Sequence, residues 1–217
     1  MTQYENEVKK RDVMCCMNAG NQGCGRKWSR MRIITDTGTD ILDKEAKKLG
    51  IELVAIRSNF TDTVFSENTE AEFTRFYDKL RQTDTLPVSS QPSPAEFLEL
   101  FEDAKEKQEE VVVITISSKL SGTYNGAMLA KDMAEYDNIY VVDSLQASLS
   151  ERLLVEYAVK LRDAGMGAKE LVRKLEQDRE RVILTGVPST LLYLKMGGRI
   201  SPVVAAVGGV IGIKPGL

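Results

Sequence analysis

The chain has 217 residues, of which 42% are apolar, 28% charged and 6% aromatic, values typical of an ordinary globular protein. The net charge is −3 and the basic residues are spread among acids, so the sequence offers no basic surface of the kind that binds nucleic acid. It contains no histidine, which excludes Ser-His-Asp and Cys-His catalysis and every imidazole metal site.

The first 30 residues show no sustained periodicity, and we expect a disordered N-terminal extension over residues 1–30. All three cysteines (Cys15, Cys16 and Cys24) lie there, so no disulfide framework supports the rest of the chain. No apolar run reaches the roughly 20 residues that a membrane span needs, nor does one resemble a signal-peptide core. We therefore expect a cytoplasmic protein without a membrane anchor.

From Met31 onward, short β-branched runs alternate with segments of helical periodicity. The expected strands cover residues 31–35, 51–56, 111–116, 138–143 and 181–187. The expected helices cover residues 41–50, 69–82, 94–108, 122–135, 147–164, 168–180 and 189–196, and residues 87–94 read as a loop. Strands separated by helices predict an α/β fold with a parallel sheet flanked by helices.

Two helix starts carry capping-box patterns. Thr69 with Glu72, and Ser93 with Glu96, have the spacing at which each side chain satisfies a backbone N–H of the first turn. Pro94 then occupies the first position of its helix, where its missing N–H costs nothing.

Three hydroxyl-rich loops lie next to predicted strands or helices: DTGTD (36–40), VSSQPS (88–93) and SSKLSGT (117–123). Ligands of open parallel sheets bind beyond the carboxyl ends of the strands, and helix N-termini there favour anions. The hydroxyls of 117–123 therefore indicate either helix capping or a pocket for a carboxylate or phosphate. Arg199, next to two glycines, has a guanidinium that pairs with such an anion, or is a surface arginine after a helix end. Asp36 and Asp40 fit a capped turn better than a metal site, so we expect no metal.

Five motifs in this order resemble the DegV family of bacterial fatty-acid-binding proteins. They are MRIITDTGTD, LPVSSQPSPAEFLELF, VVVITISSKLSGTYNGAMLAK, IYVVDSLQAS and YLKMGGRIS, and the similarity runs from Met31 to the end of the chain. The resemblance implies a two-domain α/β fold with a long-chain, palmitate-like fatty acid between the domains. It also implies a separate ATP-dependent fatty acid kinase that converts the presented carboxylate to an acyl phosphate, and a binding protein that needs no cofactor and is not itself an enzyme.

The resemblance also implies which residues hold the carboxylate. Carried over by motif, the head-group ligands are Ser89, Ser118 and Arg199. The supporting positions are Ser90, Ser117, Ser121 and Gly122. On the same basis we expect residues 31–180 to form a DegV-like α/β domain and residues 181–217 to begin a second, incomplete lipid-covering domain.

The sequence departs from the family pattern in two places. Glu151 and Arg152 stand where family members have a glycine-bearing stretch, and two charges beside an acyl tunnel are costly unless they face solvent. The chain also ends at KPGL, where the family continues, so we expect a C-terminally truncated chain.

Two other functions remain open from the sequence. One is a small-molecule hydrolase or phosphate-ester enzyme with Ser118 as nucleophile and Lys119 or Lys195 as base. The other is a non-functional fragment, since an apolar terminal segment needs a surface to pack against.

Overall fold

The computed structural model describes residues 31–83, 85–184 and 192–199. The extension predicted for residues 1–30 and the apolar segment from residue 200 onward lie outside these residues. The predicted division into domains at residue 180 therefore stays a prediction.

A four-stranded parallel sheet forms the centre of the fold. Its strands, in spatial order, are β2 (Glu52–Val54), β1 (Met31–Asp36), β6 (Glu110–Thr115) and β7 (Ile139–Asp143). Every neighbouring pair is parallel, and β1 and β6 are aligned so that Ile33 faces Val112. The central run Val111–Ile114 is fully buried, because helices cover both faces of a parallel sheet. The predicted α/β class is confirmed.

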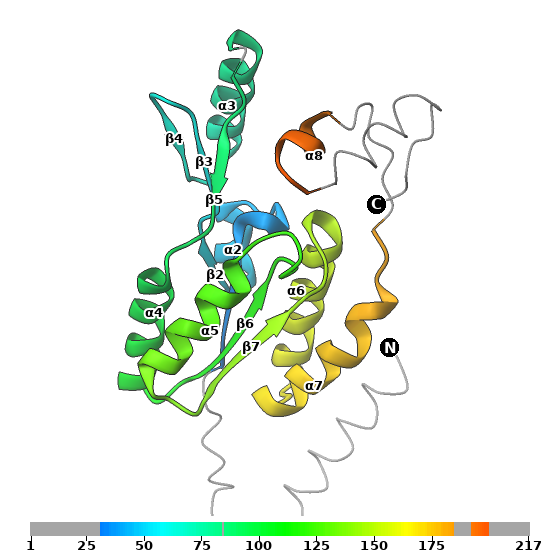
Figure 1. The fold of residues 1–217 in the computed structure, drawn as a ribbon. Coiled ribbons are helices and arrows are strands. Elements are labelled where there is room, and N and C mark those ends of the chain that lie inside the picture. Colours follow the sequence, from blue (N-terminus) through cyan, green and yellow to red (C-terminus); the bar gives the residue numbers. More distant parts are fainter. Residues whose placement is uncertain (1–30, 84, 185–191, 200–217) are drawn as a thin grey trace, which may run out of the picture.

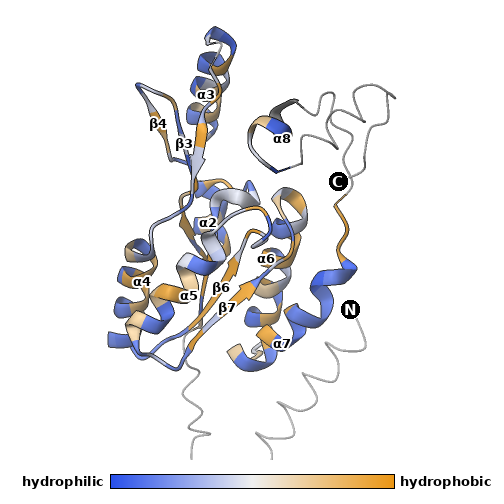
Figure 2. Cartoon of the chain, viewed as in Figure 1, coloured by the Kyte–Doolittle hydropathy of each residue, from blue (hydrophilic) through white to orange (hydrophobic). Residues whose placement is uncertain are grey.

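Helices pack on both faces of this sheet. They are α2 (Asp43–Leu49), α4 (Pro94–Glu106), α5 (Thr123–Ala134), α6 (Ser148–Asp163) and α7 (Ala168–Asp178). Figure 1 shows α4 and α5 on one side of the strands and α6 and α7 on the other. Phe97 and Phe101 of α4 form one core with Val113, and Leu171 and Leu175 of α7 contribute to the other. Figure 2 shows the resulting pattern, with hydrophobic strands between helices of mixed hydropathy.

The two predicted capping boxes differ in outcome. At α4 the Glu96 carboxylate accepts the Ser93 N–H at 2.8 Å, as expected. At α3 (Glu70–Gln82) the Thr69 hydroxyl accepts the Glu72 N–H, but the Glu72 carboxylate turns to the preceding turn. There it accepts the N–H groups of Ser66 and Glu67 at 2.7 and 3.2 Å, so it holds the turn before α3 instead of closing a capping box.

A second sheet, which the sequence did not predict, stands away from the first (Figure 1). Antiparallel strands β4 (Val64–Phe65), β3 (Arg57–Asn59) and β5 (Val88–Ser90) form it, with α3 beside it. The prediction that residues 87–94 are entirely loop is wrong for β5. Its three residues are all exposed, and such a short edge strand has no buried apolar pattern to reveal it. We call this unit, residues 57–90, the small lobe.

Aromatic side chains form the centre of the small lobe. The rings of Phe60 and Phe65 lie 5.7 Å apart, and those of Phe65 and Phe76 lie 5.5 Å apart in an edge-to-face arrangement. Such pairs stabilise by about 0.5–1.5 kcal/mol each beyond the area they bury. These contacts between aromatic rings therefore help to hold the strands of the small lobe against α3.

The strand predicted for residues 181–187 is wrong where the structure describes it. Arg179–Arg181 form a short 3₁₀ helix, η2, and residues 182–184 are irregular. The Gln146 amide donates to the carbonyls of Arg179 and Val182 at 3.1 and 2.9 Å, so a side chain occupies acceptors that a sheet would use. Residues 185–187 lie outside the described part, and the short helix α8 (Leu192–Met196) falls within the predicted range 189–196.

An ion pair joins the small lobe to the main sheet. Arg57 of β3 donates to both carboxylate oxygens of Glu96 on α4, at 2.6 and 3.1 Å. Arg57 is the main reason that the pKa of Glu96 falls to about 2. A carboxyl with a lowered pKa stabilises the fold above its unfolded pKa and loses that effect as the pH falls through its folded pKa.

Glu96→Gln should therefore destabilise the chain by about 1 kcal/mol at neutral pH, a value reduced because the pair is about one-third exposed. The deficit should shrink from about pH 4.5 downward and nearly vanish by about pH 2, as thermal unfolding of both forms would show. Glu99→Gln on the same helix serves as the control. A deficit that is independent of pH would contradict this role for the ion pair.

Candidate functional site

Two aspartates at strand ends fix the loop that carries Ser118. Asp36, which ends β1, accepts the N–H of Gly38 and the N–H of Ile116 through different carboxylate oxygens, each at 2.8 Å. Asp143, which ends β7, accepts the N–H of Ser118 at 3.1 Å. Because parallel strands end at the same edge of the sheet, these contacts tie three loops together there.

Ser117 and Ser121 serve the turn itself. Ser117 is buried, its N–H donates to the Gln146 carbonyl at 2.8 Å, and its hydroxyl accepts the Lys119 N–H at 3.3 Å. The Ser121 hydroxyl lies 2.9 Å from that of Thr123. Ser118 differs, because it is exposed and its hydroxyl makes no hydrogen bond with any residue that the structure describes. Of the hydroxyls in this loop, that of Ser118 is free to bind a ligand.

Gly122 lets a second loop approach the first. A Cβ on Gly122 would lie 1.9 Å from the Gln91 amide oxygen, and one on Gly126 would lie 3.6 Å from the Pro92 carbonyl oxygen. Only a residue without a side chain admits such contact, which explains the glycine at position 122. The segment after Ser89 therefore packs directly on the start of α5.

Arg199 bridges the same two loops. Its Nη2 lies 3.4 Å from the Ser89 hydroxyl oxygen and 3.4 Å from the Leu120 carbonyl oxygen. Its Nη1 donates to the Gly197 carbonyl at 2.5 Å, which orients the guanidinium. The structure thus brings Ser89 and Arg199 together and places both beside the loop of Ser118.

Ser89 and Arg199 line a large cavity. Its volume is about 760 Å³, within the range of about 300–1,000 Å³ typical of small-molecule sites. The lining residues are Ser58, Leu80, Thr85, Leu86, Pro87, Val88, Ser89, Met196, Gly197 and Arg199. The arrangement combines a cationic, hydroxyl-bearing end with an apolar wall, which suits an anion with an aliphatic tail.

Ser90 lies differently from its neighbour. Successive side chains of a strand point to opposite faces, so Ser90 faces away from Ser89, and its hydroxyl accepts from the Asn59 amide at 3.0 Å. The contact that the structure shows for the Ser90 hydroxyl joins β5 to β3, and a supporting role at the site stays a prediction.

A second cavity of about 300 Å³ lies under the small lobe and shares Ser58 with the first. Its apolar lining comes from Ile56, Phe65, Phe73, Phe76, Tyr77 and Ile116. Sequence reasoning missed both Ser58 and this aromatic wall. The antiparallel pairing of β3 with β5 places Ser58 opposite Ser89, and no sequence signal predicted that pairing.

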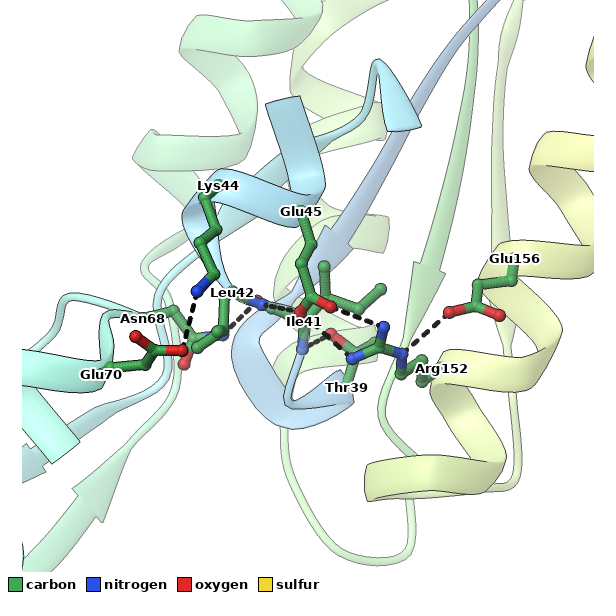
Figure 3. A network of polar contacts seen from close by, with 9 residues as sticks. All are labelled: Thr39, Ile41, Leu42, Lys44, Glu45, Asn68, Glu70, Arg152 and Glu156. Carbon is green, nitrogen blue, oxygen red and sulfur yellow. Dashed lines mark hydrogen bonds and ion pairs between the residues drawn. The ribbon is translucent and has the colours of Figure 1, made fainter. Parts of the chain in front are cut away.

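The two charges at positions 151 and 152 have different surroundings. Arg152 points outward, donating to Glu45 of α2 and to Glu156 of its own helix, as Figure 3 shows. The same network joins Lys44 to Glu70 at the base of the small lobe. Glu151, by contrast, is fully buried, so only one of the two charges faces solvent.

Neither candidate base contacts Ser118 in the part of the chain that the structure describes. Lys119 and Lys195 are exposed, and neither ammonium is hydrogen-bonded to the Ser118 hydroxyl. Among the same residues, no group of three or more Asp, Glu, Cys or His side chains is arranged to hold a metal ion. No described helix has the length and apolarity to cross a bilayer.

Gly122→Ala provides a test of the contact between loops. The new methyl group must displace the Gln91 amide, and because the Gln91 side chain is flexible we expect less than about 1 kcal/mol of lost stability. The contact of Gln91 with the start of α5 would be lost, however, so the loop carrying Ser89 would be held less firmly, and we expect weaker ligand retention at nearly unchanged Tm. Gly167→Ala, where a Cβ meets no atom within 4 Å, is the matched control. Full ligand retention in Gly122→Ala would contradict the proposed importance of the contact.

Comparisons with known proteins identify relatives of the chain and solved structures of the same fold. The model of the DegV family of uncharacterised proteins matches residues 30–217. A DegV domain-containing protein of Caldanaerobacter subterraneus is 32% identical over 186 residues, which cover 86% of this chain and 66% of that protein. The chain thus spans about two-thirds of the length of the curated relatives that it matches.

Several solved structures with the same fold concern fatty acids, among them the following two. A DegV family protein from Thermus thermophilus, described for its fatty acid binding, has a TM-score of 0.73 and 30% identity, covering 87% of this chain and 67% of that one. The fatty acid kinase B3 protein of Streptococcus pneumoniae, loaded with linoleic acid, has a TM-score of 0.68 and 29% identity, with coverages of 84% and 66%.

Proposed function

The chain belongs to the DegV family, and from this premise we propose that it binds a long-chain, palmitate-like fatty acid. Solved structures of this fold hold fatty acids. The observation that carries the proposal for this chain is the position of Ser89 and Arg199 at one end of an apolar-walled cavity of about 760 Å³.

In this proposal the head group is held by Ser89 and Arg199, which line the cavity, and by Ser118, which does not line it but whose loop lies beside Arg199. The Arg199 guanidinium supplies the positive charge, and the hydroxyls of Ser89 and Ser118 donate hydrogen bonds to the carboxylate. Ser117, Ser121 and Gly122 support the site indirectly, by fixing the turn and admitting Gln91. The aliphatic tail lies against Leu80, Leu86 and Met196.

The chain presents the bound carboxylate to a partner fatty acid kinase, which forms the acyl phosphate. Two features support this part of the proposal. Ser118 and Arg199 are exposed, so a carboxylate between them is accessible to a second protein. One structural neighbour is the fatty acid kinase B3 protein of Streptococcus pneumoniae. The chain itself is not catalytic in this scheme, because activating Ser118 as a nucleophile requires an adjacent base.

Mass spectrometry of lipid extracted from the purified chain tests the proposal. We expect a co-purifying fatty acid of long chain length and no ester or phosphate hydrolysis. An empty chain that hydrolyses such substrates, with turnover abolished by Ser118→Ala, would overturn the binding function in favour of an enzyme. A chain that neither binds nor turns over anything would favour a non-functional fragment.

A further inference from the structure

Glu151 is a buried acid with no hydrogen-bond partner in the part of the chain that the structure describes. It lies in the first turn of α6, its side chain is 0% exposed, and neither carboxyl oxygen has a hydrogen-bond partner among the described residues. An ionised carboxylate buried without a hydrogen-bond donor or a cation is destabilised by the loss of its hydration. The protonated form is therefore strongly favoured.

Other acids surround it. A point at the ideal Cβ position of Gly38 lies 2.7 Å from Asp36 Oδ1 and 3.3 Å from Glu151 Oε2, so the two carboxyls approach each other across a glycine. Burial, and then the charges of Asp36, Asp40 and Asp143, raise the pKa of Glu151 well above its ordinary value. Burial also raises the pKa of Asp36, to about 6, against the pull of its two N–H bonds.

No described cation offsets these acids at Glu151. Of the charged groups on the elements around α6, Glu45 of α2 pairs with Arg152, and Asp178 of α7 pairs with Lys174 and Arg181. Arg179 donates to the Asp143 carbonyl, and its Nε has no hydrogen-bond partner among the described residues. Asp40 accepts the Ser148 hydroxyl at the start of α6. The N-terminal dipole of α6 favours the ionised form, but this effect is weaker than the burial of a carboxylate.

Asp36 and Asp143 also hold the loop that carries Ser118. Asp36 accepts the Ile116 N–H and Asp143 accepts the Ser118 N–H, and both bonds are strongest when the aspartates are ionised. A charge on Glu151 would repel Asp36 and Asp143 inside a poorly solvated site. The state of Glu151 is thus coupled to the backbone of residues 116–118.

We propose that Glu151 is a positioning residue whose protonated carboxyl allows Asp36 and Asp143 to hold the Ser118 loop, and that loss of this proton loosens the loop. Nothing covalent is involved: one proton leaves to solvent. The further step, release of a fatty acid by the loosened loop, rests on the proposed function. The effect of Glu151 on the order of the loop is independent of that function.

The direction of the pH effect follows from the raised pKa. A carboxyl with a folded pKa above the unfolded one costs no stability below the unfolded value. Its cost grows as the pH rises from about 4.5 and is complete above the folded pKa. Glu151→Gln keeps the shape and removes the titration, so its benefit should appear only as the pH increases.

Amide hydrogen exchange of residues 116–122, measured on the lipid-free full chain, tests the inference without any ligand. At a pH of about 9 we expect these amides to exchange several-fold faster in the wild type than in Glu151→Gln, and at about pH 5 equally fast. The Tm advantage of Glu151→Gln should reach about 5 °C at the higher pH. Glu156→Gln is the control on the same helix: Glu156 is half-buried and already paired with Arg152, so this variant should follow the wild type in its pH dependence.

Equal amide exchange in the wild type and Glu151→Gln at both pH values would overturn the inference. A difference in Tm between the two forms that is the same at both pH values would also overturn it. If Glu151→Gln does not fold, ¹³C-carboxyl NMR of the wild-type chain decides. One glutamate titrating well above the ordinary range supports the inference, and none doing so overturns it. Fatty acid retention is measured separately at both pH values. A chain that holds no lipid at either pH refutes the proposed function but leaves the inference from hydrogen exchange unaffected.

Discussion

Replacing both Ser89 and Ser118 with alanine should remove bound fatty acid from the purified chain. Each hydroxyl donates to a charged carboxylate, and such a bond contributes about 1.5–3 kcal/mol. Losing both should weaken binding by about 3–6 kcal/mol, which is a factor of at least about 100. Lipid extraction and mass spectrometry of the double variant would show the loss directly.

Thr74→Ala is the control for this double variant. Thr74 lies on α3, where its hydroxyl donates to the Glu70 carbonyl at 2.9 Å, and it does not line the cavity. It should retain as much lipid as the wild type. If the double variant keeps a normal lipid content at an unchanged Tm, the two serines do not hold the head group.

Phe101→Ala should cause the largest loss of stability of any change considered. Phe101 is fully buried between α4 and the sheet, with the Phe97 ring 6.1 Å away. Truncating a buried phenylalanine leaves a cavity and costs about 3–5 kcal/mol. For a chain of this size we expect Tm to fall by about 10 °C.

Leu129→Ala on α5 is the comparison for Phe101→Ala. Leu129 is 52% exposed, so its removal should change Tm by no more than a degree or two, about 0.5 kcal/mol. Similar effects of the two substitutions would mean that the α4 face is not the packed core that the structure describes.

The main sheet could be predicted because β1, β6 and β7 are long and rich in β-branched residues. Residues 111–116 form a continuous β-branched run, and each helix between strands carries apolar residues at helical spacing. The parallel order then follows from the alternation of strands and helices. The small lobe gave no such signal, since β4 has two residues and β5 three, and residues as polar as Arg57–Asn59 do not read as a strand.

The candidate site was predictable in its residue types but not in its construction. Hydroxyls at a strand end indicated an anion site, and motif resemblance assigned Ser89, Ser118 and Arg199. The role of the aspartates in holding the loop could not be predicted, because the contact between Asp36 and Ile116 joins residues 80 positions apart. The burial of Glu151 was equally hidden, because a glutamate beside an arginine at the start of a helix reads as a solvated turn.

A crystal structure of the chain grown with palmitate would show where the head group binds. We expect the carboxylate within hydrogen-bond distance of the Ser89 hydroxyl and the Arg199 guanidinium, with the aliphatic tail in the cavity lined by Leu80 and Met196. A carboxylate bound away from both residues, or a cavity that stays without palmitate at saturating concentration, would contradict this expectation.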